Sequence, residues 1–336
     1  NADVQIAAPV DDYRLTGTIK AAVAELAPYS NLAGRTLGGG VDVTLDGTLL
    51  PDLSLFDVTL DGSTRSLKVD IPQVDALMAG PGTISGGAAR TGPDAFALTN
   101  LDIATPQLTV QGSANGGLTG PLAADITARL NDAGALAGGL NGPLAIDLTA
   151  DRNAAGTAQV NLTANGSGAD VTLDAQVAPQ EDDYRITGNL DAAVANLASF
   201  AALAGQPVSG SVNLTANGTL LPDLSQLDAQ LNATTGNLAI GNEQVDQLLR
   251  GQGRIVLDAA KSGSDITLRS FDVQFPQLTA SGNLSAAGGG AANGTIDARL
   301  ADVGLFTDAL SGPVTAQGQI GRTAAGGYTL NIDATG

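Results

Sequence analysis

The alternating stretch Asp170-Val171-Thr172-Leu173-Asp174-Ala175-Gln176-Val177 decides the fold. Successive side chains of a β-strand point to opposite faces of a sheet, so strict polar and apolar alternation predicts a strand with one apolar face. The sequence therefore predicts an all-β protein. Apolar residues occupy every second position in other segments as well: Val41, Val43 and Leu45; Leu144, Ile146 and Leu148; Val160 and Leu162; Val212 and Leu214; Leu330 and Ile332.

The residues between these strands predict antiparallel pairing. Asn-Gly and Asp-Gly pairs favour the tight hairpins that join antiparallel neighbours. One-sided alternation agrees, because strands of parallel sheets are usually apolar on both faces. We expect hairpins at six pairs: Asn115-Gly116, Asn165-Gly166, Asn217-Gly218, Asn293-Gly294, Asp46-Gly47 and Asp61-Gly62.

One long repeat occurs in two tandem copies. Asp11-Asp12-Tyr13-Arg14 recurs 171 residues later as Asp182-Asp183-Tyr184-Arg185, and residues 47–54 recur unchanged at 218–225. We therefore place repeat 1 at 1–171 and repeat 2 at 172–336, with about ten strands in each. We expect the two repeats to form one continuous curved sheet, and we interpret the chain as a fragment of a longer array.

A few segments break the alternation. Ile19 to Tyr29 and Leu190 to Leu203 are rich in Ala and Leu, with an apolar spacing closer to that of a helix. Val245 to Leu249 and Asp302 to Leu310 are shorter examples. We expect brief helices or turns at these four places, capping an edge of the sheet.

Composition excludes several classes of function. The net charge is −19, and the 15 Lys and Arg residues are scattered, whereas nucleic acid requires a positive footprint. The chain has no Cys, so neither a disulfide framework nor a thiolate metal site is expected. No apolar run is long enough to span a membrane as a helix. No signal peptide opens the sequence.

Signals for an enzyme are weak, and we expect no enzymatic activity. His is absent, which removes the most common general acid–base residue and the Ser-His-Asp arrangement. The paired carboxylates Asp11-Asp12 and Asp182-Asp183 are expected to be solvated turn residues. The competing interpretation is a glycan-acting enzyme that uses these paired carboxylates, in which replacement of Asp12 and Asp183 by Asn would abolish hydrolysis. We predict no cofactor and no metal.

Three sequence features together carry a resemblance to a known protein family. A Leu- and Ala-rich segment at 195–205 precedes a Gly-containing strand at 208–212, and a Gly-Thr-Leu-Leu-Pro-Asp-Leu turn occurs at 47–53 and 218–224. Val-Asp-x-Leu segments at 74–77 and 245–248 lead into Gly-x-Gly. With these features the chain resembles the middle repeat region of the TamB and AsmA-like family of Gram-negative envelope proteins.

That resemblance implies a fold and a function. The family forms a long U-shaped, taco-like β-sheet with an apolar trough, anchored in the inner membrane and reaching through the periplasm. It is linked to phospholipid transport between the membranes and, in a translocation and assembly module, to outer-membrane protein assembly with a barrel partner. The resemblance implies a periplasmic location for this chain, and it carries over no catalytic residue.

The apolar face is thus the candidate site. We expect it to bind phospholipid acyl chains through Val41, Val43, Leu45, Leu144, Ile146, Leu148, Val160, Leu162, Val171, Leu173, Val212, Leu214, Leu330 and Ile332. Headgroup recognition should be poor, because Trp is absent and Tyr and Arg are few. Exposed edge strands favour self-association. The alternative is a structural or adhesive β-solenoid surface protein with a closed dry core.

Overall fold

The computed structural model describes residues 2–7, 14–180, 183–306 and 309–336. The chain divides into two units, unit 1 from Asn1 to Ser167 and unit 2 from Gly168 to Gly336. This division lies four residues before the repeat boundary placed after residue 171. Both units are all-β with a few short helices, as the sequence predicts.

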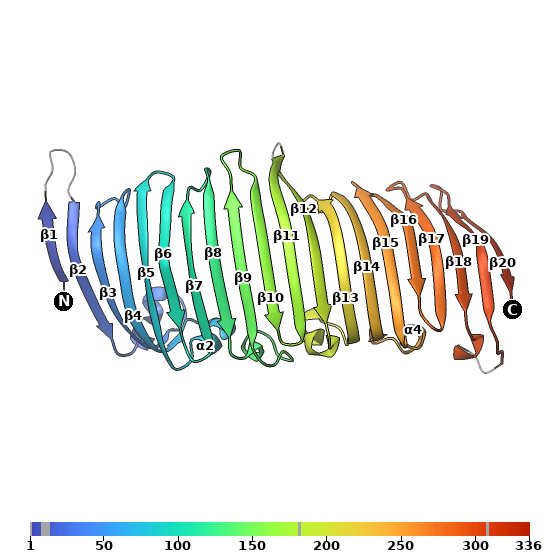
Figure 1. Ribbon diagram of the computed structural model, residues 1–336, viewed down its shortest axis with the longest axis horizontal. Coiled ribbons are helices and arrows are strands. Elements are labelled where there is room, and N and C mark those ends of the chain that lie inside the picture. The colour runs from blue at the N-terminus through green and yellow to red at the C-terminus, as the bar shows by residue number, and fades with distance from the viewer. Residues whose placement is uncertain (1, 8–13, 181–182, 307–308) are drawn as a thin grey trace. The chain divides into compact units, whose positions relative to one another are not determined.

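Unit 1 is an antiparallel meander, in which each strand pairs with the next one along the chain (Figure 1). Ten strands are the number expected from the alternation. They are β1 (Ala2–Ala7), β2 (Arg14–Val23), β3 (Gly38–Leu49), β4 (Phe56–Lys68), β5 (Pro81–Gly92), β6 (Ala95–Ala104), β7 (Leu108–Gly116), β8 (Leu122–Leu130), β9 (Leu144–Arg152) and β10 (Ala158–Gly166).

Unit 2 repeats the same meander. Its strands are β11 (Ala169–Gln180), β12 (Asp183–Val194), β13 (Ser209–Leu220), β14 (Gln226–Ala239), β15 (Gln252–Ser262), β16 (Asp265–Gln274), β17 (Leu278–Ala286), β18 (Ala292–Leu300), β19 (Val314–Arg322) and β20 (Tyr328–Thr335).

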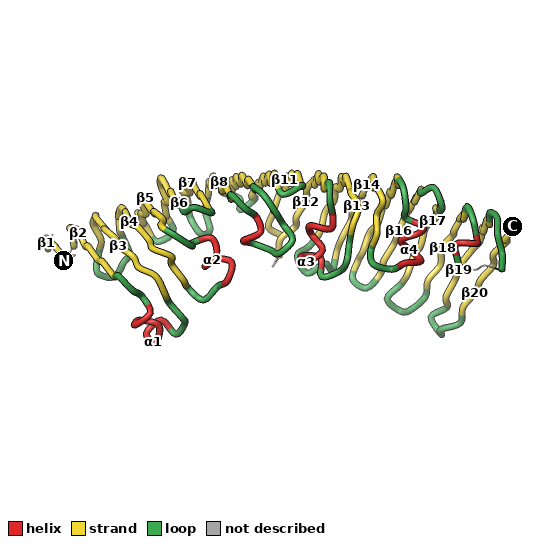
Figure 2. Tube along the Cα trace, turned by 90° about the horizontal axis from the view of Figure 1, so that it is seen from below, coloured by secondary structure: helices red, strands yellow, loops and turns green. Residues whose placement is uncertain are grey.

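All helices lie at one edge of their sheet. Each follows an even-numbered strand, and in a meander these connections share one edge, which we name the helix edge. The opposite edge, with the odd-to-even connections, is the loop edge. Figure 2 shows that the helix-edge segments of each unit lie to one side of its strands. The helices are η1 (Ala27–Tyr29), α1 (Ser30–Ala33), α2 (Pro72–Leu77), η2 (Ala133–Ala135), η3 (Leu197–Phe200), α3 (Ala201–Ala204), α4 (Glu243–Leu248) and η4 (Val303–Leu305).

The predicted helical segments are only partly helical. The prediction was wrong for 19–23 and 190–194, which end β2 and β12. Ala favours helices, but pairing with β3 and β13 overrides this local preference. The prediction for 245–249 is confirmed by α4. At 302–310 a single turn, η4, forms, and residues 307–308 lie outside the described residues.

Four of the six predicted hairpins were also wrong. Asp46-Gly47 and Asp61-Gly62 lie inside β3 and β4, and Asn217-Gly218 lies inside β13. Asn293-Gly294 lies inside β18, whereas the remaining two pairs end β7 and β10. A Cβ at Gly218 would collide with the backbone carbonyl of Asp228 in β14. Glycine is thus required there by the close approach of the next strand rather than by a turn.

Neither unit has a packed core of the usual kind. The accessible surface is 19234 Å² for a chain of 33.3 kDa, whereas a folded globular monomer of this mass exposes about 12,600 Å². A single sheet with no second layer on it explains the excess. Among the described residues seven apolar side chains are buried: Leu50, Leu130, Ala133, Leu140, Ala175, Ala233 and Phe275.

Candidate functional site

The pairing register places the apolar residues of unit 1 on one face. Directly opposed partners in antiparallel strands point to the same side of the sheet, so successive pairings define a row across the strands. We name the side defined by this row and its parallel neighbours the apolar face. Its central row is Ala21, Val43, Gly62, Ile84, Ile103, Val110, Ala128, Ile146 and Ala164.

Unit 2 has an apolar face built in the same way. One row crosses all ten of its strands and contains only apolar residues and glycine. Its neighbours on the same face are similar, so this face too is continuous from the first strand of the unit to the last. The row is Leu173, Leu190, Ala216, Leu231, Leu257, Phe271, Gly282, Ile296, Gly318 and Ile332.

Every residue predicted for the candidate groove lies on the apolar face of its unit. In unit 1 these are Val41, Val43 and Leu45 on β3, Leu144, Ile146 and Leu148 on β9, and Val160 and Leu162 on β10. In unit 2 they are Val171 and Leu173 on β11, Val212 and Leu214 on β13, and Leu330 and Ile332 on β20.

Much of the apolar face remains exposed to solvent. Leu330 is 69% exposed, Ile266 49% and Leu284 41%. Soluble monomers rarely expose contiguous apolar patches larger than a few hundred Å². Exposed apolar surface of this kind is typical of faces that contact a ligand or a partner.

Most of the buried apolar side chains that the structure describes lie beside the helix edge, whereas Leu50, after β3, and Ala175, on β11, are buried away from it. Leu130 at the end of β8 is 5% exposed, and Ala133 of η2 is completely buried. Thr64 and Thr235, which occupy equivalent repeat positions on β4 and β14, are also buried. The helix edge therefore shields one margin of the apolar face and leaves much of the rest open.

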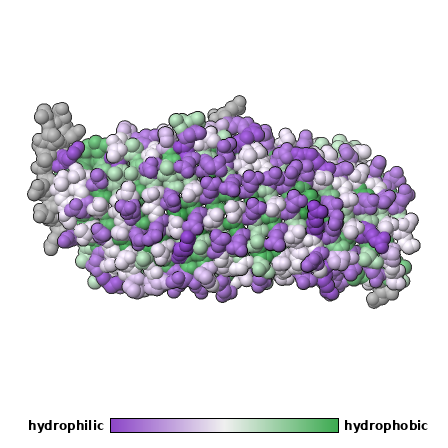
Figure 3. All heavy atoms as spheres, in the orientation of Figure 1, coloured by the Kyte–Doolittle hydropathy of each residue, from purple (hydrophilic) through white to green (hydrophobic). Residues whose placement is uncertain are grey.

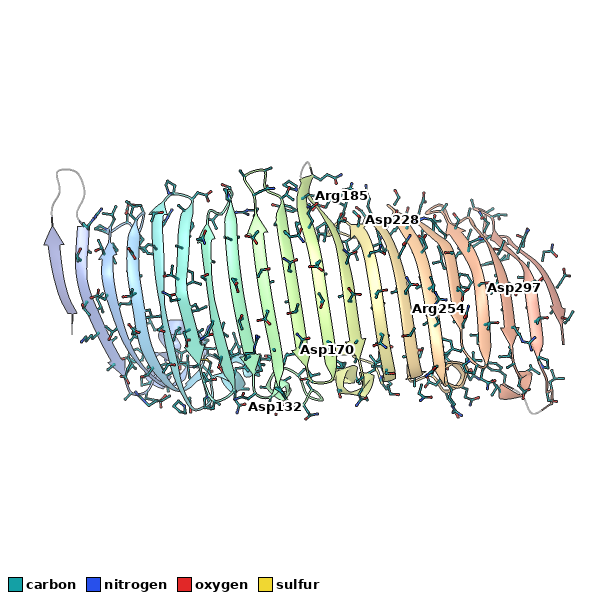
Figure 4. All side chains as sticks on the ribbon, in the orientation of Figure 1. Asp132, Asp170, Arg185, Asp228, Arg254 and Asp297 are labelled. Atoms are coloured by element: carbon teal, nitrogen blue, oxygen red, sulfur yellow. The ribbon has the colours of Figure 1, made fainter. Side chains whose placement is uncertain are left out.

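The opposite, polar face holds neighbouring strands together through side-chain pairs. Thr16 and Thr48 are 3.0 Å apart at their hydroxyls, and the equivalent Thr187 and Thr219 are 3.1 Å apart. Arg269 donates to both Asp228 and Asp258, which raises the pKa of its guanidinium, chiefly through the hydrogen bond to Asp228. In the view of Figure 3 hydrophilic side chains are spread over the strands. Figure 4 labels Asp170, Asp228, Arg254 and Asp297 of this face.

Sequence reasoning missed four basic residues that lie on the apolar face. Arg90 and Arg152 of unit 1 are in the row Leu15, Leu49, Phe56, Arg90, Phe96, Gly116, Leu122, Arg152 and Ala158. Lys261 and Arg322 of unit 2 are in the row Val177, Ile186, Leu220, Leu227, Lys261, Ile266, Ala286, Ala292, Arg322 and Tyr328. The repeat offsets relate Arg90 to Lys261 and Arg152 to Arg322, and that signal would have found them.

Of the candidate carboxylate pairs the structure describes only Asp183. Asp11, Asp12 and Asp182 lie outside the described residues, and Asp183 accepts a hydrogen bond from the amide of Tyr184 at 2.7 Å within β12. No group of three or more Asp, Glu, His or Cys side chains that could hold a metal gathers in the described part of the chain. Nor do the described segments contain a helix long and apolar enough to cross a membrane.

Comparison with known proteins gives no assignment. No protein-family model matches the chain, and no curated protein or solved structure matches it significantly.

Proposed function

We propose that the chain is a segment of a hydrophobic trough that binds phospholipid acyl chains. The observation that carries this proposal is the set of uninterrupted apolar rows that remain open to solvent in each unit, as in the row from Leu173 to Ile332. Contact of such a surface with water is unfavourable. Each lipid methylene group that is buried on the surface contributes about 0.8 kcal/mol to binding.

The shape of the surface favours acyl chains over a compact ligand. The central rows of the two units consist of Ala, Val, Leu, Ile and Phe with Gly between them, and they offer no directional contact along their length. Hydrophobic attraction is itself non-directional. A lipid chain is therefore free to slide along the rows, as transport requires.

The alternative is a structural or adhesive β-solenoid with a closed dry core. Such a core requires a second layer or a closed coil over the apolar residues. Within each unit the described strands form an open meander, and Leu284 and Leu330 of unit 2 remain substantially exposed. These observations favour the trough.

The cellular role follows from the resemblance noted in the sequence. We propose a periplasmic location, as part of an inner-membrane-anchored protein of the TamB and AsmA-like family. The role would be phospholipid transport between the two membranes, outer-membrane protein assembly with a barrel partner, or both. The acyl-chain proposal stands on the apolar rows and does not require this family assignment.

Photocrosslinking on adjacent residues tests the proposal. A photoreactive amino acid is placed at Leu173 or Val212 on the apolar face, or at Thr172 or Asn213 on the polar face of the same strands. After incubation with phospholipid vesicles and illumination, intact mass measures the lipid adduct. We expect adducts at Leu173 and Val212 and few at Thr172 and Asn213.

Native mass spectrometry of the purified chain provides an independent measurement. We expect phospholipid to remain bound after purification. Absence of bound lipid, together with equal crosslinking on both faces, would show that the apolar face is not a lipid site.

A further inference from the structure

The charged residues of the sheets are segregated by face. Apart from β1, each Asp within a described strand occupies a polar-face position, for example Asp147 on β9 and Asp297 on β18. On the apolar faces of the same strands the charged residues are Arg90, Arg152, Lys261 and Arg322. Within the described strands from β2 onward, the apolar faces of this acidic chain therefore carry positive charge only.

These four cations lie in one place along the strands. In each unit both belong to the single row nearest the loop edge, and the two are four strands apart, or about 19 Å. We name these the basic rows. The two repeats preserve the charge at both positions, although Arg90 is replaced by Lys261.

Local hydrogen bonds position these cations without neutralising them. Arg90 donates to the carbonyl of Leu53, and Lys261 donates to the equivalent carbonyl of Leu224 at 2.7 Å. Arg152 donates to Gly120, and Arg322 lies over the ring of Tyr328. None of the four forms an ion pair with a carboxylate in the described part of the chain.

Two carboxylates in the neighbouring turns, Asp52 and Asp223, are engaged mainly by other groups. The pKa of Asp52 is lowered mainly by hydrogen bonds from Ser54, and only as a minor cause by Arg90. The pKa of Asp223 is likewise lowered mainly by hydrogen bonds from Ser225, and less by Lys261. The basic rows therefore retain the capacity to attract an anion.

The distance from the basic row to the helix edge fits a lipid. From Leu122 in the basic row of unit 1 to Leu130 at the helix edge, β8 extends about 27 Å. One leaflet of a bilayer has a hydrocarbon thickness of about 15 Å, half that of the whole hydrocarbon core. A lipid with its headgroup at the basic row thus has room for its acyl chains on the apolar face.

We infer that the basic rows hold the phosphate headgroups of anionic phospholipids, with the acyl chains extended toward the helix edge. This inference rests on the proposed function and adds an orientation and a headgroup preference to it. It differs from the expectation from composition that headgroup recognition is poor, because the four basic residues of the apolar face lie in one row of each unit.

A loading competition tests the headgroup preference. The full chain is incubated with equimolar phosphatidylglycerol and phosphatidylcholine vesicles, re-isolated, and the bound lipids are quantified by mass spectrometry. We expect enrichment of phosphatidylglycerol by about fivefold, the effect of an exposed ion pair of about 1 kcal/mol. Arg152→Gln with Arg322→Gln should reduce this enrichment to about twofold or less, because Arg90 and Lys261 remain.

The matched control removes the same charge from the other face. Arg254→Gln with Arg299→Gln changes two polar-face arginines of unit 2 and should keep the enrichment. Because Arg152 also donates to a backbone carbonyl, Arg322→Gln alone and Arg152→Lys with Arg322→Lys are compared as well. The lysine variant should retain the preference for phosphatidylglycerol.

Orientation is tested with single cysteines, which the Cys-free chain allows. A fluorophore is attached at Ala292→Cys in the basic row, or at Ala298→Cys on the same face of β18 toward the helix edge. A nitroxide on the lipid headgroup should quench the first more strongly, and a nitroxide near the acyl terminus should quench the second more strongly.

The outcomes separate the two proposals. If no lipid of either kind is recovered from any variant, the acyl-chain trough itself is wrong. If lipid is recovered with the same composition from all variants, or if both nitroxides quench both positions equally, the trough stands and the headgroup orientation is overturned.

Discussion

The two faces of each sheet are made of the same strands, yet they are held in different ways. On the polar face, partners such as Thr16 and Thr48 or Arg269 and Asp228 satisfy each other across neighbouring strands. On the apolar face, residues such as Leu284 and Leu330 contact their row neighbours but have no layer above them. The polar face thus adds side-chain pairs to the backbone pairing of the strands, while much of the apolar face is left exposed to solvent.

Substitutions beside the helix edge and in the open area of the apolar face should differ most in their effect on the free energy of unfolding. Leu130→Ala removes a side chain that is 5% exposed and should cost about 2–3 kcal/mol of unfolding free energy. Leu284→Ala removes one that is 41% exposed and should cost less than about 1 kcal/mol. Urea denaturation measures both values. Equal losses would mean that the open area is covered in solution.

The same substitution at neighbouring residues on opposite faces should change the amount of retained phospholipid differently. Ile255 lies on the apolar face of β15, and Val256 lies on its polar face. Ile255→Asp places a charge among the acyl chains and should lower retained phospholipid by about tenfold or more. Val256→Asp introduces the same charge on the solvated side and should leave retention unchanged. Quantitative lipid extraction after purification distinguishes the two.

Acid should weaken the polar face selectively. Hydrogen bonds from Arg129 and then Thr127 lower the pKa of Asp147 below its ordinary value of 3.8. Because the folded-state pKa is lowered, this contribution to stability is fully present above the unfolded pKa. It is lost as pH falls through the folded pKa. The urea concentration at the midpoint of unfolding should therefore decrease when the pH is lowered below about 4. The Asp147→Asn variant should show a smaller decrease over that range.

Edge strands should make the chain self-associate as the protein concentration rises. The only described pairing of β20 is with β19, which leaves its other side open to strand addition. Thr329→Lys with Asn331→Lys places charges on the polar side of β20 and should shift the sedimentation profile toward smaller species. A monomeric profile for the unmodified chain at high concentration would contradict this expectation.

The smallest effect should come from the two polar-face ion pairs of Arg269. Arg269→Ala breaks the contacts at 2.6 Å with Asp228 and at 2.7 Å with Asp258. These ion pairs are accessible to solvent, so the urea midpoint should decrease slightly at low salt and hardly at all at high salt. A large loss that salt does not affect would mean that these pairs are central to the sheet.

Much of the fold was predictable because alternation is a local property. The stretch from Asp170 to Val177 lies in β11 as an alternating strand, and ten strands form in each unit. The hairpin prediction failed at Asp46-Gly47 and Asn217-Gly218 because glycine serves two purposes, tight turns and close approach of strands. Only the neighbouring strand, far away in sequence, decides which of them applies.

By itself the sequence determined that the strands have two unlike faces and that the pattern repeats, since both follow from the order of residues along one strand. The tertiary structure decided which residues stand side by side, because register depends on pairing between distant segments. It therefore decided that Arg90, Arg152, Lys261 and Arg322 fall into the rows nearest the loop edge. It also decided that much of the described apolar face is left exposed to solvent.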